Sequence, residues 1–172
     1  MAMNVRPIEI RGDFALIPLT QGKHARIDVE DAEKVRNYNW CAIKDGNTFY
    51  AKAWIDGSHV MLHQRILQVP DGFLPDHIDR DGLNNRRSNL RVATRTQNQG
   101  NQTKSKRNTS GFKGVREAKW ATGSKRWRAS IVENHKVKHL GYFYTPEEAA
   151  KAYDDAAIEY FGDFATVNFG RV

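Results

Sequence analysis

The stretch from Asp76 to Asn98 most constrains what this chain of 172 residues can fold into and do. It begins with Asp76-His77 and continues with two spaced asparagines, Asn89 and Asn98. Hydrolysis of a phosphodiester needs a base that activates water and a cation that absorbs charge on the phosphate oxygens. His77 can act as the base, and Asp76 and Asn98 offer the hard oxygen ligands that Mg²⁺ prefers. The pattern therefore favours a metal-dependent phosphodiesterase site.

A polar surface loop is the alternative explanation of the same residues. Asp81-Gly82 is a dipeptide that marks a turn, but a turn does not explain Asp-His at one end and a spaced Asn at the other. Residues 90–93 predict a short strand, and residues 94–97 have the capping-box pattern that begins a helix. We expect Asn98 near the first turn of that helix, where a ligand is held rigidly.

This stretch resembles the HNH endonucleases found among phage homing and nicking enzymes. The family pattern is roughly Asp-His-x-Asp-Gly, followed by Asn-Asn, by Asn-Leu-Arg and by a further Asn. The resemblance covers about residues 50–102, although Gly82 stands two places later than the glycine of the family. We therefore expect the first turn of the loop to have a different shape.

The resemblance implies a ββα-metal site, also called a His-Me finger. His77 would be the general base, and Asn89 would bridge the loop and orient its imidazole. Asp76 and Asn98 would bind a divalent metal, Mg²⁺ in the first instance and Mn²⁺ as the alternative. His63 matches a His-Arg pair common before the Asp-His of the family, and it is either an active-site group or a structural histidine. The pattern favours the structural role.

Cysteine content and hydropathy limit the class of protein. The single Cys41 excludes a disulfide framework and a Cys₄ zinc site, and it indicates a reducing compartment. The chain has no apolar run long enough to span a membrane. We expect a cytoplasmic protein, in a bacterial host cell if a phage encodes it, with no membrane association and no implied protein partner.

The net charge of +7 is concentrated in one region, because no acidic residue occurs between Arg86 and Arg116. Such a run is often a solvated surface, but one this one-sided favours a track for a polyanion. Within it, residues 103–110 are wholly polar, which is typical of a linker. The expected partner is double-stranded DNA.

The first 49 residues predict a β-rich leader with a scaffold role. Residues 8–11 and 14–19 alternate apolar and polar side chains around Gly12-Asp13, which indicates a hairpin. A short helix is expected between residues 28 and 37. Trp40 and Trp54 are both predicted to lie in the core.

The C-terminal segment predicts a small sheet followed by a helix. Residues 111–116, 125–131 and 136–143 each alternate apolar residues with basic or aromatic ones, so one face of the sheet is apolar and the other cationic. The helix is expected to begin after Thr145, with Pro146 in its first turn, and to end at Gly162.

This segment resembles the Apetala/ethylene-response-factor DNA-binding domain over residues 110–169. The shared marks include Gly114-Val115-Arg116, Leu140-Gly141-x-Phe143 and a closing Asn168-Phe169. In that family a three-stranded sheet lies in the major groove. Together with the basic run, the resemblance gives these candidate DNA-binding residues: Arg86, Arg87, Arg91, Arg95, Lys104, Lys106, Arg107, Lys113, Arg116, Arg126, Arg128, Lys136 and Lys138.

The sequence thus predicts an α+β protein in four parts. These are a leader (1–49), an HNH ββα-metal module (50–102), a basic linker (103–110) and a DNA-binding module with a three-stranded antiparallel sheet packed on one helix (111–172). The predicted function is a metal-dependent, homing-type DNA endonuclease that nicks its target, which the C-terminal sheet binds. The alternative is a sequence-specific DNA-binding or regulatory protein whose nuclease fold is vestigial.

Overall fold

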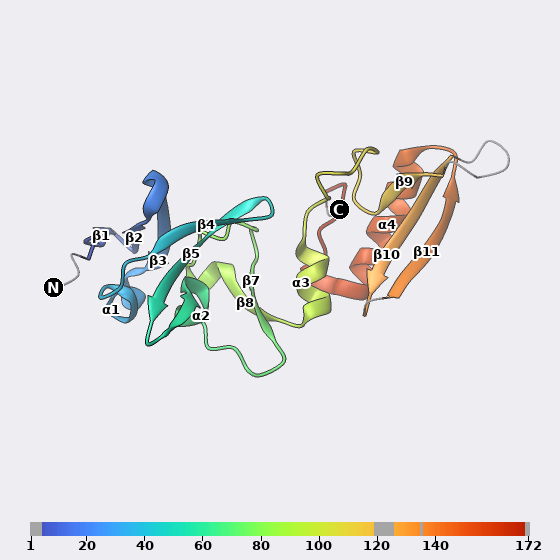
Figure 1. Ribbon diagram of the computed structural model, residues 1–172. Helices are drawn as coiled ribbons and strands as arrows, with labels where there is room; N and C mark the ends of the chain where they lie inside the picture. Colours follow the sequence, from blue (N-terminus) through green and yellow to red (C-terminus); the bar gives the residue numbers. More distant parts are fainter. Residues whose placement is uncertain (1–4, 119–125, 135, 171–172) are drawn as a thin grey trace. The chain divides into compact units, whose positions relative to one another are not determined.

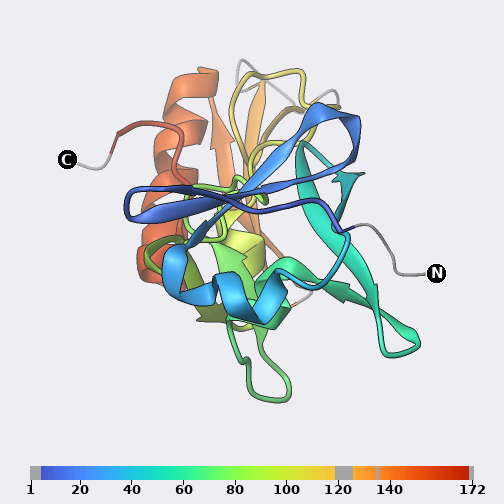
Figure 2. The same cartoon turned by 90° about the vertical axis from the view of Figure 1, so that its left-hand side faces the viewer.

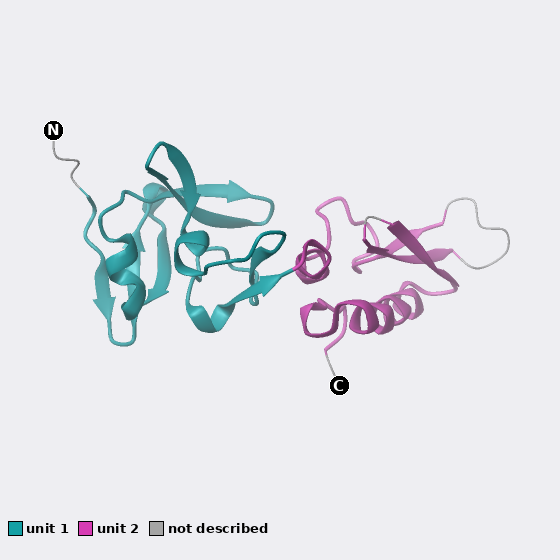
Figure 3. Ribbon diagram, turned by 90° about the horizontal axis from the view of Figure 1, so that it is seen from below, with its two compact units in different colours: residues 1–93 teal, residues 94–172 magenta. Residues whose placement is uncertain are grey.

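The computed structural model describes residues 5–118, 126–134 and 136–170. The chain forms two compact units, residues 1–93 and 94–172 (Figure 3). The predicted division into four parts is finer than this and stays a prediction. Small antiparallel sheets and short helices confirm the α+β class (Figure 1). Within the described ranges, no helix has the length and apolar character needed to cross a membrane.

Two antiparallel three-stranded sheets form most of the first unit (Figure 2). The predicted hairpin is confirmed as β1 and β2, and the expected short helix as α1. The first sheet consists of β1 (Glu9–Arg11), β2 (Phe14–Pro18) and β3 (His24–Asp28). The second consists of β4 (Cys41–Asp45), β5 (Thr48–Ile55) and β6 (Ser58–Met61). The helices are α1 (Ala32–Val35) and α2 (Leu62–Ile66).

The core of the first unit contains one of the two tryptophans predicted for it. Trp40 is 1% exposed, and its indole nitrogen donates to the carbonyl of Val35. Trp54, however, is 62% exposed, so its prediction as a core residue is wrong. Ala53 and Ile55 occupy the inward positions of β5 on either side of it, and side chains alternate along a strand. Trp54 therefore points outward.

A two-stranded sheet contains Asp76 and His77, the first two residues of the motif. β7 (Leu74–His77) pairs antiparallel with β8 (Leu90–Ala93), so that His77 lies opposite Leu90. In the loop between them, Arg80 stands where the family pattern has glycine, and it adopts a left-handed φ of 66°. Gly82 is required for a different reason. A Cβ on it would lie 2.5 Å from the carbonyl oxygen of Phe49 on β5.

The second unit has the predicted order of three strands and a helix. It consists of α3 (Arg95–Asn101), β9 (Val115–Glu117), β10 (Trp127–Glu133), β11 (Lys136–Phe143) and α4 (Pro146–Phe161). The expected capping boxes at Thr94 and Thr145 are confirmed, and Gly162 ends α4. Lys125, expected at the start of the second strand, lies outside the described residues.

The first strand of this sheet is shorter than residues 111–116 predicted. Gly111 and Gly114 have φ angles of 84° and 77°, which turn the chain before β9 begins at Val115. The ring of Tyr153 on α4 packs where a Cβ of Gly114 would lie. Asp154 on the same helix accepts hydrogen bonds from the backbone N–H groups of Asn168 and Phe169. The closing Asn-Phe of the motif therefore anchors the end of the domain to α4.

Replacing Arg80 by glycine should stabilise the first unit. A left-handed conformation costs a residue with a side chain about 1–2 kcal/mol, and the greater freedom of glycine in the unfolded chain offsets part of that gain. We expect Arg80→Gly to raise the free energy of unfolding by roughly 0.5–1 kcal/mol in urea titrations. Gly82→Ala is the comparison variant and should destabilise the unit, because its Cβ would collide with the carbonyl oxygen of Phe49 on β5. Destabilisation by Arg80→Gly would contradict the account of this turn.

Candidate active site

The end of β7 buries two adjacent polar side chains, Asp76 and His77. They are 4% and 6% exposed, although neither is apolar. Buried polar groups require hydrogen-bond partners, so the contacts of these two residues define the site. Arg91, directly across the ladder on β8, donates from Nε to Oδ2 of Asp76 at 2.8 Å.

The orientation of the His77 ring is fixed by Asn85, which is 0% exposed. Nε2 of His77 lies 3.2 Å from Oδ1 of Asn85. The amide nitrogen of Asn85 donates to the carbonyl of Gly82 at 3.3 Å, and this turns Oδ1 toward the imidazole. Because an amide oxygen only accepts, Nε2 must donate. The lone pair of the neutral ring therefore lies on Nδ1.

The environment favours the neutral, basic form of His77. Burial lowers the pKa of His77 below its ordinary value, while the Asn85 hydrogen bond and the charges of nearby aspartates act in the opposite direction. Burial has the larger effect. The ring is consequently neutral near pH 7 and able to accept a proton, as a general base must.

Asn89 bridges the loop between β7 and β8. Its amide nitrogen donates to Oδ1 of Asp79 at 2.8 Å and to the carbonyl of Asn84 at 2.7 Å, and its Oδ1 accepts from the backbone N–H of Asp79. Burial alone would raise the pKa of Asp79, but hydrogen bonds from Asn84, Asp81 and Asn89 keep it below its ordinary value. The predicted bridging contacts are present. Direct orientation of the imidazole by Asn89 stays a prediction, since the ring bond described above goes to Asn85.

The role of Asn85 was not predicted, although the motif contained a signal for it. The family pattern has two adjacent asparagines, of which Asn84 and Asn85 are the counterparts here. The predictions assigned no role to either residue of this pair. Asn85 is instead the residue that β3 holds in place, because its backbone N–H donates to the carbonyl of Arg26 at 2.7 Å.

Leader residues also hold the arginines that follow Asn85. Asp28 accepts from Nε of Arg86 and from the backbone N–H of Arg87, both at 2.7 Å. Asp31, which is fully buried, binds the Arg87 guanidinium through both carboxylate oxygens. The loop between β7 and β8 is therefore held by β3 and by the turn that follows it.

His63 and Tyr50 complete the surroundings of His77. The centroid of the His63 ring lies 5.2 Å from that of His77, edge to face, and the ring of Tyr50 contacts both. Burial, followed by repulsion from His77 when that ring is protonated, lowers the pKa of His63 to about 4. His63 thus lies beside the predicted base as a neutral ring. The choice between its structural and active-site roles stays a prediction.

The donor set at this site suits a hard cation better than zinc. In the described residues, no three His, Cys, Asp or Glu side chains gather in a group that could hold a metal ion. Mg²⁺ keeps several waters and needs only one or two protein oxygens, and Asp76 offers a buried carboxylate. Asn98 lies in the first turn of α3, as expected, but in the second unit. Its role as a ligand stays a prediction.

The candidate DNA-binding residues fall into three groups. Arg86, Arg87 and Arg91 are paired with carboxylates of the first unit, which neutralise much of their charge. Lys104, Lys113 and Lys138 contact their own unit: Gly111, Gly100 and Glu133, respectively. The remaining candidates are exposed or half-buried: Arg95, Lys106, Arg107, Arg116, Arg126, Arg128 and Lys136.

Comparisons with known proteins bear on this site. The family model described as HNH endonuclease matches residues 68–99, which contain β7, the loop and β8. An uncharacterized HNH endonuclease of Acanthamoeba polyphaga mimivirus is 34% identical over 164 residues, covering 90% of this chain and 80% of that protein. The chain belongs to the HNH endonuclease family. Membership indicates a nuclease, and HNH endonucleases generally depend on a divalent metal.

Other relatives match part of the HNH protein. An ethylene-responsive transcription factor of Arabidopsis thaliana is 36% identical over 97 residues, or 56% of this chain and 59% of the plant protein. Protein 3.8 of Escherichia phage T7 is 37% identical over 68 residues, or 40% of this chain and 54% of the phage protein. The predicted resemblances to the HNH endonucleases and to the ethylene-response-factor family are thereby confirmed. Together these resemblances imply DNA binding. No solved structure matches the chain.

The buried His63 should make the stability of the HNH protein depend on pH. Its pKa is about 4 when folded and ordinarily 6.5, so the unfolded chain binds more protons as the pH falls below 6.5. The contribution of the neutral His63 ring to the free energy of unfolding is fully present above pH 6.5, and it is lost as the pH falls toward 4. We expect this ring to account for about 2–3 kcal/mol of the decrease in unfolding free energy between pH 7 and roughly pH 4.5.

Urea denaturation at the two pH values measures this loss. His63→Phe should reduce the pH dependence, whereas His24→Gln, at an exposed position on β3, should leave it unchanged. An equal pH dependence in wild type and His63→Phe would show that the His63 ring is not buried in neutral form.

Proposed function

We propose that this HNH protein is a metal-dependent DNA endonuclease of the homing type that nicks double-stranded DNA. The observation that carries the proposal is the bond from Nε2 of His77 to Asn85, which places the basic lone pair of the neutral ring on Nδ1. Asp76, the preceding residue, adds a buried carboxylate. One such site among the described residues favours a nick, because one centre cuts one strand per binding event.

His77 would take a proton from water at Nδ1 while that water attacks the phosphorus. Asn85 would hold the ring in the required tautomer through Nε2, and burial would keep it neutral until the proton arrives. Asp76 and Asn98 would hold the cation, Mg²⁺ or alternatively Mn²⁺. When bound, a divalent cation stabilises charge on the phosphate and on the leaving 3′ oxygen.

The outer face of the C-terminal sheet is the proposed reader of double-stranded DNA. Val115, Ala129 and Ile131 face the helix and are buried, so Arg116 and Arg128 project from the opposite face. The two arginines lie directly opposite each other across the ladder. Like charges in this arrangement repel, and a phosphate between them would relieve the repulsion.

His77→Ala should abolish cleavage and leave DNA affinity nearly unchanged. General-base catalysis contributes about 10²- to 10⁴-fold to a rate, and the charges expected to bind DNA lie elsewhere. Plasmid relaxation with and without Mg²⁺ measures the rate, and a mobility shift measures affinity. Retention of near wild-type cleavage would show that His77 is not the base. Binding without cleavage by the wild type, with any metal, would favour the vestigial alternative.

Neutralising the two outer arginines should weaken the salt dependence of DNA binding. Each lost phosphate contact changes the slope of log affinity against log salt by about 0.9, so Arg116→Gln with Arg128→Gln should flatten it by roughly 2. Lys138→Gln is the matched control, because Lys138 bonds Glu133 and lies over the ring of Tyr160 on α4. Equal slopes for the double variant and wild type would assign DNA binding to another surface.

A further inference from the structure

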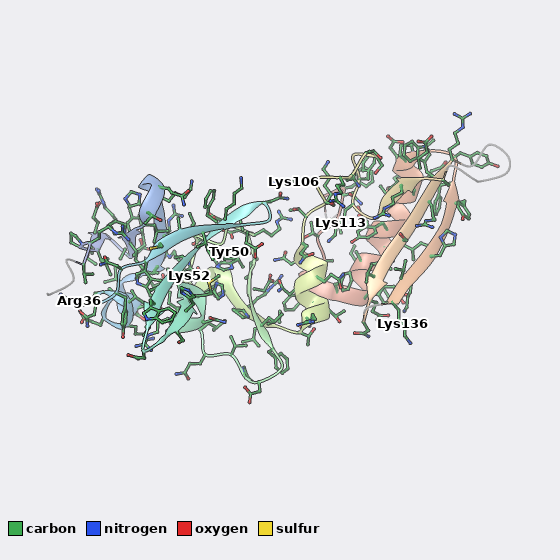
Figure 4. The ribbon with its side chains drawn as sticks, in the orientation of Figure 1. Arg36, Tyr50, Lys52, Lys106, Lys113 and Lys136 are labelled. Atoms are coloured by element: carbon green, nitrogen blue, oxygen red, sulfur yellow. The ribbon has the colours of Figure 1, made fainter. Side chains whose placement is uncertain are left out.

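One face of β5 extends from the candidate active site to an exposed aromatic pair. Ala51, Ala53 and Ile55 are buried on the inner face of this strand. Alternation therefore places Tyr50, Lys52 and Trp54 together on its other face, and Figure 4 labels Tyr50 and Lys52. With the cross-strand neighbour His59, these residues form what we call the β5 face.

The outer end of the β5 face is apolar and open to solvent. Trp54 pairs with His59 of β6, and the ring centroids lie 4.8 Å apart in an edge-to-face arrangement. Trp54 nevertheless remains 62% exposed. A tryptophan held in one orientation by a neighbouring ring presents a preformed apolar surface, and such rigid aromatic groups are suited to binding.

The inner end of the face contacts the site itself. The ring centroid of Tyr50 lies 5.8 Å from that of His77. Tyr50 and Trp54 lie four residue steps apart along the strand, a distance of about 13 Å. Duplex DNA rises about 3.4 Å per base pair, so the face spans roughly four base pairs. Lys52, midway along it, is half-buried and carries a positive charge.

We propose that the β5 face binds the DNA duplex that flanks the cleaved phosphate, about four base pairs to one side. Lys52 would contact a backbone phosphate, and Trp54 with His59 would pack against sugars and base edges in the minor groove, where apolar side chains can insert. This extends the proposed function, on which it rests, and gives the predicted leader and HNH boundary region a direct role in binding. The positive charge and the continuity with His77 favour DNA over a protein partner.

Binding by the full chain in the presence of a chelator tests the proposal without requiring cleavage. We expect Trp54→Ala to weaken affinity for a 30-base-pair duplex by about tenfold at every salt concentration. Ile10→Ala is the matched control, because Ile10 is 56% exposed on β1 of the same unit. Lys52→Gln should instead reduce the salt slope by about 0.9. Equal affinities for wild type, Trp54→Ala and Ile10→Ala would overturn the proposal.

Duplex length supplies a second, geometric test. When the duplex on one side of the cleaved bond is shortened below about four base pairs, wild type and Trp54→Ala should bind equally. An unchanged advantage of wild type on the short duplex would contradict the placement. A change of oligomeric state on Trp54→Ala, measured by light scattering, would assign the face to a second copy of the chain and overturn DNA binding. Loss of cleavage in His77→Ala tests the proposed function separately.

Discussion

The hydrogen bond from Nε2 of His77 to Asn85 is the contact on which the proposed chemistry depends. It is buried, so its partner cannot be replaced by bulk water, and it decides which ring nitrogen carries the lone pair. Two hydrogen bonds to backbone carbonyls hold Asn85 in turn. Its side-chain amide nitrogen donates to the carbonyl of Gly82, and its backbone N–H donates to the carbonyl of Arg26 on β3. The loop between β7 and β8 is therefore held on a strand that lies 58 to 59 residues earlier in the chain.

Two aspartates near the end of β3 also hold this loop. Asp28 and Asp31, at and just after the end of β3, bind Arg86 and Arg87 of the loop, and Asp31 is fully buried. Removing one partner of a buried ion pair leaves an unpaired charge that is costly in the interior. Residues 28 and 31 thus hold the loop between β7 and β8 in place, and the scaffold role of the whole leader stays a prediction. The β5 face, which begins just after the predicted leader, adds a surface by which the first unit would reach DNA.

Local features were predictable from the sequence, and contacts across the fold were not. The hairpin at Gly12-Asp13 and the helix starts at Thr94 and Thr145 were predicted correctly, because turn dipeptides and capping boxes act within a few residues. The outward position of Trp54 depended on which face of β5 meets the core, and hydropathy alone assigned it wrongly.

The site was predictable to the same extent. The motif identified Asp76 and His77 as candidate site residues, and the structure shows that both are buried. The family resemblance implied that Asn89 bridges the loop, and its bridging contacts are present. It did not identify Asn85 as the partner of the ring, because two neighbouring asparagines are equivalent until the fold separates them. The charge run beginning at Arg86 likewise gave no sign that aspartates distant in sequence pair with its first arginines.

The tautomer of His77 is the most direct test of the central claim. Nitrogen-15 NMR of the labelled imidazole rings, with His77→Gln used to assign the signal, distinguishes a protonated ring nitrogen from one that carries a lone pair. Our account predicts a neutral His77 at pH 7 with its proton on Nε2, and loss of this preference in Asn85→Ala. A proton on Nδ1, or a doubly protonated ring at pH 7, would contradict it.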